Sequence, residues 1–120
     1  MQPKVFNWDE VSADSPISLL SRRIIRGQQA MVAQVTLQKG CVIKTHSHEN
    51  EQIAVILSGR ARFGLGDELS ADRTEIELRG GNVLVLDSWL PHSVEILEDA
   101  VIMDIFSPPA DRMGVDDQKE

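Results

Sequence analysis

The chain has 120 residues, with 12 Lys and Arg against 19 Asp and Glu, so its formal net charge is −7. This length fits one domain, and the acidic balance argues against nucleic acid as a partner, because phosphate binding needs a basic face. No apolar run approaches the roughly 18 residues of a membrane span, and the acidic first residues lack the apolar stretch of a secretory signal. A single cysteine, Cys41, leaves no internal disulfide, which favours a cytoplasmic location.

Short apolar segments separated by turn signals run along the chain, a pattern typical of an all-β sandwich or barrel. Residues 17–25 fit either a strand or a helix. Residues 31–37 alternate apolar and polar side chains, as a half-buried strand does. Residues 52–57 form a nearly continuous apolar run, which Ser58 and Gly59 are expected to end. The strands expected after that point are 60–65, 74–78, 83–86 and a last hairpin of 92–97 and 100–106, with its turn at Glu98-Asp99.

Composition divides the chain into three parts. Residues 1–29 are expected to form an N-terminal strand or arm, and residues 30–107 the barrel. Residues 108–120 begin with the two prolines of a Ser-Pro-Pro sequence and carry six charges, which favours a mobile acidic tail. The one basic cluster, Arg22, Arg23 and Arg26, is interpreted as a solvated face or a dimer contact in preference to an anion site.

All three histidines fall in two segments framed by glycines. His46 and His48 are two residues apart, so on a strand both side chains project to the same face and present two imidazoles to one point. Gln52 has the same parity at the head of the next apolar run. Parity across the intervening turn is not fixed, so Glu51 stays open as an alternative. His92 follows a glycine turn and a short strand.

These residues resemble the two motifs of the cupin superfamily, Gly-x5-His-x-His-x3-Gln-x6-Gly from Gly40 to Gly59 and Gly-x10-His from Gly81 to His92. The resemblance implies an all-β cupin jelly-roll barrel, a double-stranded β-helix. It also implies one divalent transition metal (Zn, Ni, Fe, Mn or Cu) held by His46, His48, Gln52 and His92. Three imidazoles and a neutral amide would leave the charge of that ion uncancelled, which favours an anionic ligand such as a carboxylate.

The last strand resembles a narrower group, the cupins that open the rings of unsaturated uronic acids. Asp104 and Phe106, followed by Ser-Pro-Pro, match residues that line the sugar pocket in that group. The pocket arginine of the group is matched only by Arg112, two residues late, where Ala110 takes the expected place. Asp104 is interpreted as a general base, a partner that orients a metal ligand, or a structural hydrogen bonder.

The sequence therefore predicts a metal-dependent enzyme that isomerises a small carboxylated or sugar-derived molecule, most concretely by opening an unsaturated uronate. Its expected site residues are the four metal ligands with Asp104, Phe106 and Arg112. Two alternatives stay open: a metal-dependent dioxygenase, and a cupin that binds a small ligand without catalysis. We expect a homodimer, because open sheet edges need covering and cupins of this size usually pair.

Overall fold

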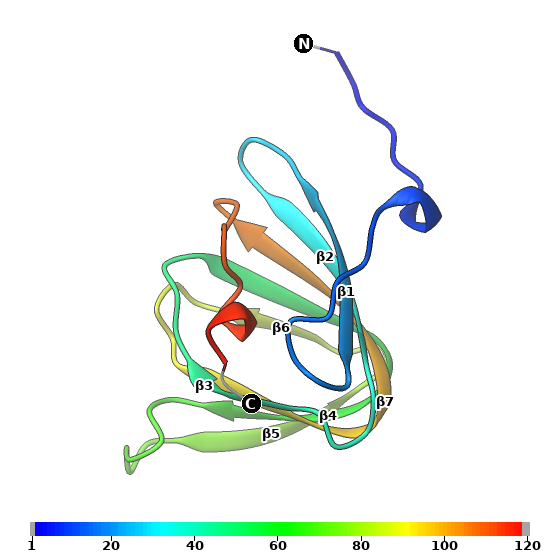
Figure 1. Ribbon diagram of the computed structural model, residues 1–120. Coiled ribbons are helices and arrows are strands. Elements are labelled where there is room, and N and C mark those ends of the chain that lie inside the picture. Colours follow the sequence, from blue (N-terminus) through cyan, green and yellow to red (C-terminus); the bar gives the residue numbers. More distant parts are fainter. Residues whose placement is uncertain (1, 119–120) are drawn as a thin grey trace.

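The computed structural model describes residues 2–118, which fold around a seven-stranded antiparallel sheet (Figure 1). Met1, Lys119 and Glu120, at the ends of the expected arm and tail, lie outside the described residues. Two short 3-10 helices flank the strands, η1 (Trp8–Glu10) and η2 (Val115–Asp117). The strands are β1 (Leu20–Arg26), β2 (Met31–Leu37), β3 (Val42–His46), β4 (Glu51–Leu65), β5 (Thr74–Arg79), β6 (Val83–Leu86) and β7 (His92–Ser107).

Two long, bent strands join the two halves of the barrel. The first half of β4 pairs with β6 and with the second half of β7, whose other edge carries β2 and then β1. The second half of β4 pairs with β5 and with the first half of β7, whose other edge carries β3. The sheet therefore folds over on itself as a jelly roll, with the side chains of one face enclosed, as the all-β expectation requires.

The predicted hairpin at Glu98-Asp99 is wrong, because β7 runs unbroken through these residues. The predicted break at Ser58-Gly59 is wrong in the same way, since β4 continues to Leu65. At this level Ser58 pairs with Val101 and Arg60 with Glu98, so Gly59 faces two residues of β7. This is a bulge, where one strand carries an extra residue and the sheet bends. The turn signals thus mark the bend of the barrel.

Residues 17–25, which fitted a strand or a helix, contain β1, paired along its whole length with β2. Arg22 of β1 is buried, so the solvated-face interpretation is wrong for this residue. The enclosed apolar side chains include Leu20, Met31, Ala33, Val35, Leu37, Ala54, Ile56, Phe63, Ile96, Ile102 and Phe106. Cys41 is buried, forms no disulfide among the described residues, and donates from Sγ to the Ser18 carbonyl at 3.7 Å. Among residues 2–118, no helix is long and apolar enough to cross a membrane.

The C-terminal segment, residues 110–118, lies against the barrel between β1 and β3 (Figure 1). Its composition predicted a mobile tail, but Ala110, Met113 and Val115 are buried in the core. Asp116 pairs with Arg22. Three small or apolar side chains, this ion pair and hydrogen bonds from Arg26 and Lys44 therefore hold a segment that is rich in charged residues.

Candidate metal centre

The three histidines come from neighbouring pieces of the barrel wall. His46 is the last residue of β3 and pairs across the ladder with His92, the first residue of β7. His48 lies two residues beyond β3, in the loop that leads to β4. One ligand atom from each ring lies within 4.8 Å of the others. The structure thus brings His92 next to His46 and His48, which precede it in the sequence by more than 40 residues.

Backbone carbonyls orient each ring through its Nδ1 atom. The Nδ1 atoms of His46, His48 and His92 lie 2.9, 3.0 and 2.8 Å from the carbonyl oxygens of Lys44, Asn50 and Leu90. A carbonyl oxygen only accepts hydrogen bonds, so a neutral ring in this position carries its proton on Nδ1. The Nε2 atoms then keep their lone pairs, which is the form in which imidazole binds a metal.

Hydrogen bonds with two other segments hold the loop that carries His48 in place. The Trp89 amide donates to the carbonyl of His48 at 2.8 Å, and the Ser88 hydroxyl donates to the carbonyl of Glu49. The buried Asn50 side chain donates to the Pro108 carbonyl at 2.6 Å, just past the end of β7. Trp89 has a φ of +66°, a conformation that favours glycine, and its side chain is exposed. These bonds set the position of His48 relative to His92.

Gln52 and Asp104 complete the polar side of the centre. Nε2 of Gln52 donates to Oδ1 of Asp104 at 3.0 Å, which turns Oε1 of the amide toward His48, 3.1 Å from its Nε2 atom. Gln52 is buried and Glu51 is exposed. Parity therefore places the amide, and not the neighbouring carboxylate, beside the histidines. Asp104 holds the amide oxygen in the orientation that a metal ligand needs.

Two contacts test whether a cation fits this centre. The Nε2 atom of His92 is buried and has no hydrogen-bond partner among the described residues. His48 has an oxygen acceptor beside each ring nitrogen, although a neutral ring has only one N–H to donate. A cation between these nitrogens and the Gln52 oxygen would satisfy both. The residues present therefore fit a divalent transition metal, for which imidazole is a common ligand.

Burial sets the protonation of the centre. Burial lowers the pKa of His92 to about 4, and it also lowers the pKa of His46. Both rings are then neutral at pH 7, as metal binding requires. Burial raises the pKa of Asp104 to about 6, against the hydrogen bond from Gln52, which lowers it. A carboxylate with this pKa is ionised at neutral pH and still basic enough to accept a proton.

Comparison with known proteins agrees with this arrangement. The family described as "Cupin domain" matches residues 33–106, more than half of the chain. The chain belongs to the cupin family. No curated protein sequence matches it.

Solved structures show the same fold. The structure of KdgF from Halomonas sp. is 25% identical, with a TM-score of 0.80, and the match covers 92% of this chain and 97% of that one. An RmlC-like cupin from Shewanella frigidimarina is 15% identical, with a TM-score of 0.80, over 92% and 95% of the two chains. Bacillus subtilis oxalate decarboxylase is 20% identical, with a TM-score of 0.76, over 88% of this chain and 30% of that one. One structure of that decarboxylase was studied for its Mn(II) centres.

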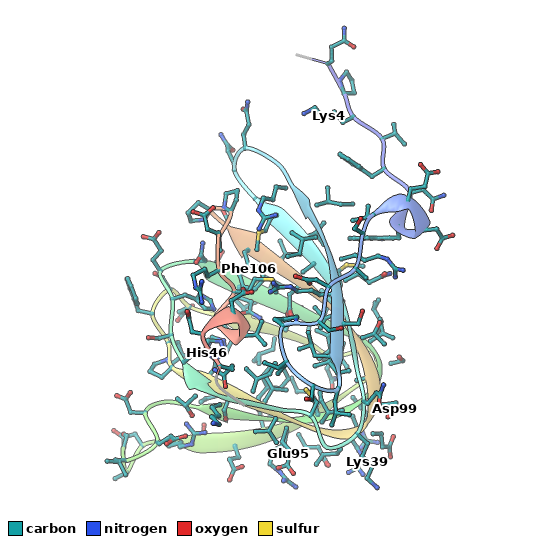
Figure 2. The ribbon with its side chains drawn as sticks, in the orientation of Figure 1. Lys4, Lys39, His46, Glu95, Asp99 and Phe106 are labelled. Atoms are coloured by element: carbon teal, nitrogen blue, oxygen red, sulfur yellow. The ribbon has the colours of Figure 1, made fainter. Side chains whose placement is uncertain are left out.

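The cavity of this cupin contains most of the expected site residues. It is lined by His46, Gln52, His92, Asp104 and Phe106. The ring of Phe106 meets that of His48 edge to face, with centroids 5.6 Å apart. Figure 2 shows His46 and Phe106 inside the barrel, whereas Lys39, Glu95 and Asp99 lie at its outer edge.

Arg112 lies outside the cavity. Its side chain is 61% exposed and donates to Asp117 at 2.7 Å and to the carbonyl of Asp116 at 2.8 Å. A role for Arg112 in the site thus stays a prediction and would require a different position of the C-terminal segment. Conversely, Arg22 lines the cavity and Asn50 holds the His48 loop, and sequence reasoning missed both. Asn50 is at an unspecified position of the first histidine motif and Arg22 lies outside both motifs, so no local signal marked them.

Proposed function

We propose that this cupin is a metal-dependent enzyme that isomerises a small carboxylated sugar derivative by opening the ring of an unsaturated uronate. One observation carries the proposal: a basic carboxylate, Asp104, is hydrogen-bonded to Gln52 in the cavity that His46 and His92 line. The resemblance of the last strand to uronate-opening cupins supplies the substrate class. The expected residues of the site are His46, His48, Gln52 and His92 as metal ligands, with Asp104, Phe106 and Arg112 at the substrate.

The reaction transfers one proton from one atom of the substrate to another. Asp104 accepts the proton of the anomeric hydroxyl, the bond from that carbon to the ring oxygen breaks, and the carbonyl forms. The same proton returns to the alkene carbon, so the product is an isomer and no co-reactant is consumed. A divalent metal bound by His46, His48, Gln52 and His92 supplies Lewis-acid polarisation of a substrate oxygen. Phe106 offers an apolar wall for one face of the sugar ring.

Metal content is the first test of this function. We expect the purified protein to contain close to one equivalent of a transition metal, and chelation to lower its melting temperature, because bound metal stabilises only the folded state. Content below about a tenth of an equivalent, with no effect of chelation, would contradict the metal site.

Turnover separates the enzyme from its alternatives. With an unsaturated uronate, we expect the conjugated ultraviolet band to decay without oxygen uptake. Replacing Asp104 with Asn should lower turnover about 100-fold, in the range of general-base catalysis, with metal content unchanged. Glu51→Gln removes an exposed carboxylate beside Gln52 and is the matched control. Oxygen uptake with phenolic or diketone substrates would favour a dioxygenase, and binding without turnover a non-catalytic cupin.

Assembly and location are part of the same proposal. Val83 and Val85 of β6 are more than half exposed, and a partner copy would cover such apolar side chains. The one cysteine, Cys41, is buried and forms no disulfide among residues 2–118, which suits a reducing, cytoplasmic compartment. Light scattering should give twice the mass of the chain if it is a homodimer, and the mass of one chain would contradict this expectation.

A further inference from the structure

Arg22 is a buried cation in the wall of the cavity. It lies on β1, opposite Val35 of β2, and only 7% of its side chain is exposed. It lines the same cavity as Gln52, Asp104 and Phe106. A guanidinium is rarely buried unless carboxylates or other acceptors surround it.

Two carboxylates meet Arg22 from different directions. Asp14 approaches from the outside, with 61% of its side chain exposed, and accepts from Nε at 2.8 Å and from Nη2 at 3.2 Å. Asp116 binds the end of the guanidinium with both oxygens, accepting from Nη1 at 2.9 Å and from Nη2 at 2.5 Å. This two-bond geometry is the one by which arginine recognises a carboxylate group.

Asp116 belongs to the C-terminal segment, which covers the cavity. Met113 and Val115 of this segment line the cavity, and Gly114 lies so close to His46 that an added Cβ would be 2.6 Å from its Nε2 atom. The cavity volume is about 40 Å³, room for a few water molecules but far below the roughly 300 Å³ of a small-molecule site. A sugar acid can enter only when the C-terminal segment moves away.

We propose that Arg22 anchors the carboxylate of the ligand, and that Asp116 occupies this anchor until the ligand displaces it together with the C-terminal segment. The proposal deepens the proposed function, on which it rests for the class of ligand. It assigns the anchoring role to a residue of β1, whereas the resemblance to uronate-opening cupins pointed to Arg112.

The energetics couple opening of the cavity to the charge of the ligand. If the segment lifted with the cavity empty, the inner end of Arg22 would lose its charged acceptor, which is unfavourable for a buried cation. A ligand carboxylate restores the same two bonds, and Asp14 stays paired on the outer side. A neutral molecule of the same shape offers Arg22 no charged acceptor in place of Asp116. Carboxylated ligands should therefore open the cavity, while their neutral analogues should not.

The test follows the Nε–H signal of Arg22 by NMR in the metal-loaded protein, with acetate as the probe and acetamide as its neutral analogue. Acetate should shift this signal saturably, and Asp116→Asn should tighten the apparent dissociation constant about tenfold, because the competing occupant is weakened. The Asn side chain can still accept from the Met113 amide, which donates to Asp116 at 2.8 Å. Asp117→Asn, one residue along and without a bond to Arg22, is the matched control and should leave the constant unchanged.

An equal dissociation constant in the wild type and Asp116→Asn would overturn the proposal, as would an equal response to acetamide. Arg22→Lys keeps the positive charge but cannot form the two parallel hydrogen bonds of a guanidinium. In the Asp116→Asn background, this substitution should weaken acetate binding at least fivefold. Binding to the lysine variant is measured by competition between acetate and a spin-labelled carboxylate. Neither measurement uses turnover. A protein that binds acetate at Arg22 but leaves unsaturated uronates intact would contradict the proposed function and keep this inference.

Discussion

The barrel wall and the C-terminal segment both contribute to the cavity, but they are held in different ways. The residues of the wall lie on strands whose register is fixed by continuous ladders, such as thirteen paired positions between β4 and β7. The segment 110–118 has no ladder. It is held by three buried side chains, by Asp116 on Arg22, and by hydrogen bonds from Arg26 to the Ala110 carbonyl and from the Lys44 amide to Gln118. The wall can therefore keep the histidines in place while the segment moves.

The same kind of substitution should act differently in the two regions. Glycines with positive φ occur in both, at Gly59 in the bend of β4 and at Gly114 in the segment. In the wall, any displacement breaks the pairing of several strands. In the segment, displacement costs only the local contacts.

Gly59→Ala should destabilise the whole protein. A Cβ at this position would collide with the Asp99 carbonyl oxygen and come within 2.6 Å of the Ala100 Cα, at a φ of +85°. Since both obstacles are backbone atoms of β7, we expect the free energy of unfolding to fall by about 3 kcal/mol in a urea titration. Gly81→Ala, with a φ of +101° and no atom within 4 Å of the new Cβ, should cost only about 1 kcal/mol. Equal losses in the two variants would contradict the role given to the bend.

Gly114→Ala should release the segment and leave the barrel intact. The new Cβ would meet the ring of His46, which the ladder holds, so the segment has to lift. We expect tryptic cleavage after the exposed Arg112 to accelerate about tenfold, because cleavage follows the population of the open form, while the urea midpoint changes little. Gly66→Ala, at a φ of +105° with only ordinary contacts, is the control and should leave cleavage at Arg112 unchanged. Global unfolding of Gly114→Ala would show that the segment is part of the cooperative barrel.

The sequence could predict the wall far better than the segment. Residues 31–37 and 83–86 match β2 and β6 to the residue, because alternation and glycine turns are local signals. The bend was misinterpreted, since Gly59 and Glu98-Asp99 look the same in a bulge as in a turn. What distinguishes the two is a pairing between residues nearly 40 positions apart, such as Arg60 with Glu98.

The residues of the candidate site also differ in how well the sequence predicts them. The spacing of the histidine motifs identified residues that the structure brings together, because a strand projects alternate side chains to one face. Arg22 and Asn50 depend on partners 94 and 58 residues away. A buried polar residue shows no pattern in its own segment, so its burial follows only from contacts that the complete fold creates.

Acid should release the segment through Asp116. The hydrogen bonds from Arg22 hold the pKa of Asp116 below its ordinary value of 3.8. A carboxyl whose pKa is lower in the folded state contributes stability above its ordinary pKa and loses it as the pH falls through the lower value. Arg22 and Arg112 both act in this direction on Asp116, and burial opposes them.

Hydrogen exchange at the Gly114 amide, corrected for its intrinsic pH dependence, should therefore stay slow from pH 7 down to about 4 and accelerate below it. In Asp116→Asn it should be faster at pH 7 and show no such step. A step at higher pH, shared by both proteins, would instead assign the release to His46, which lies beneath Gly114.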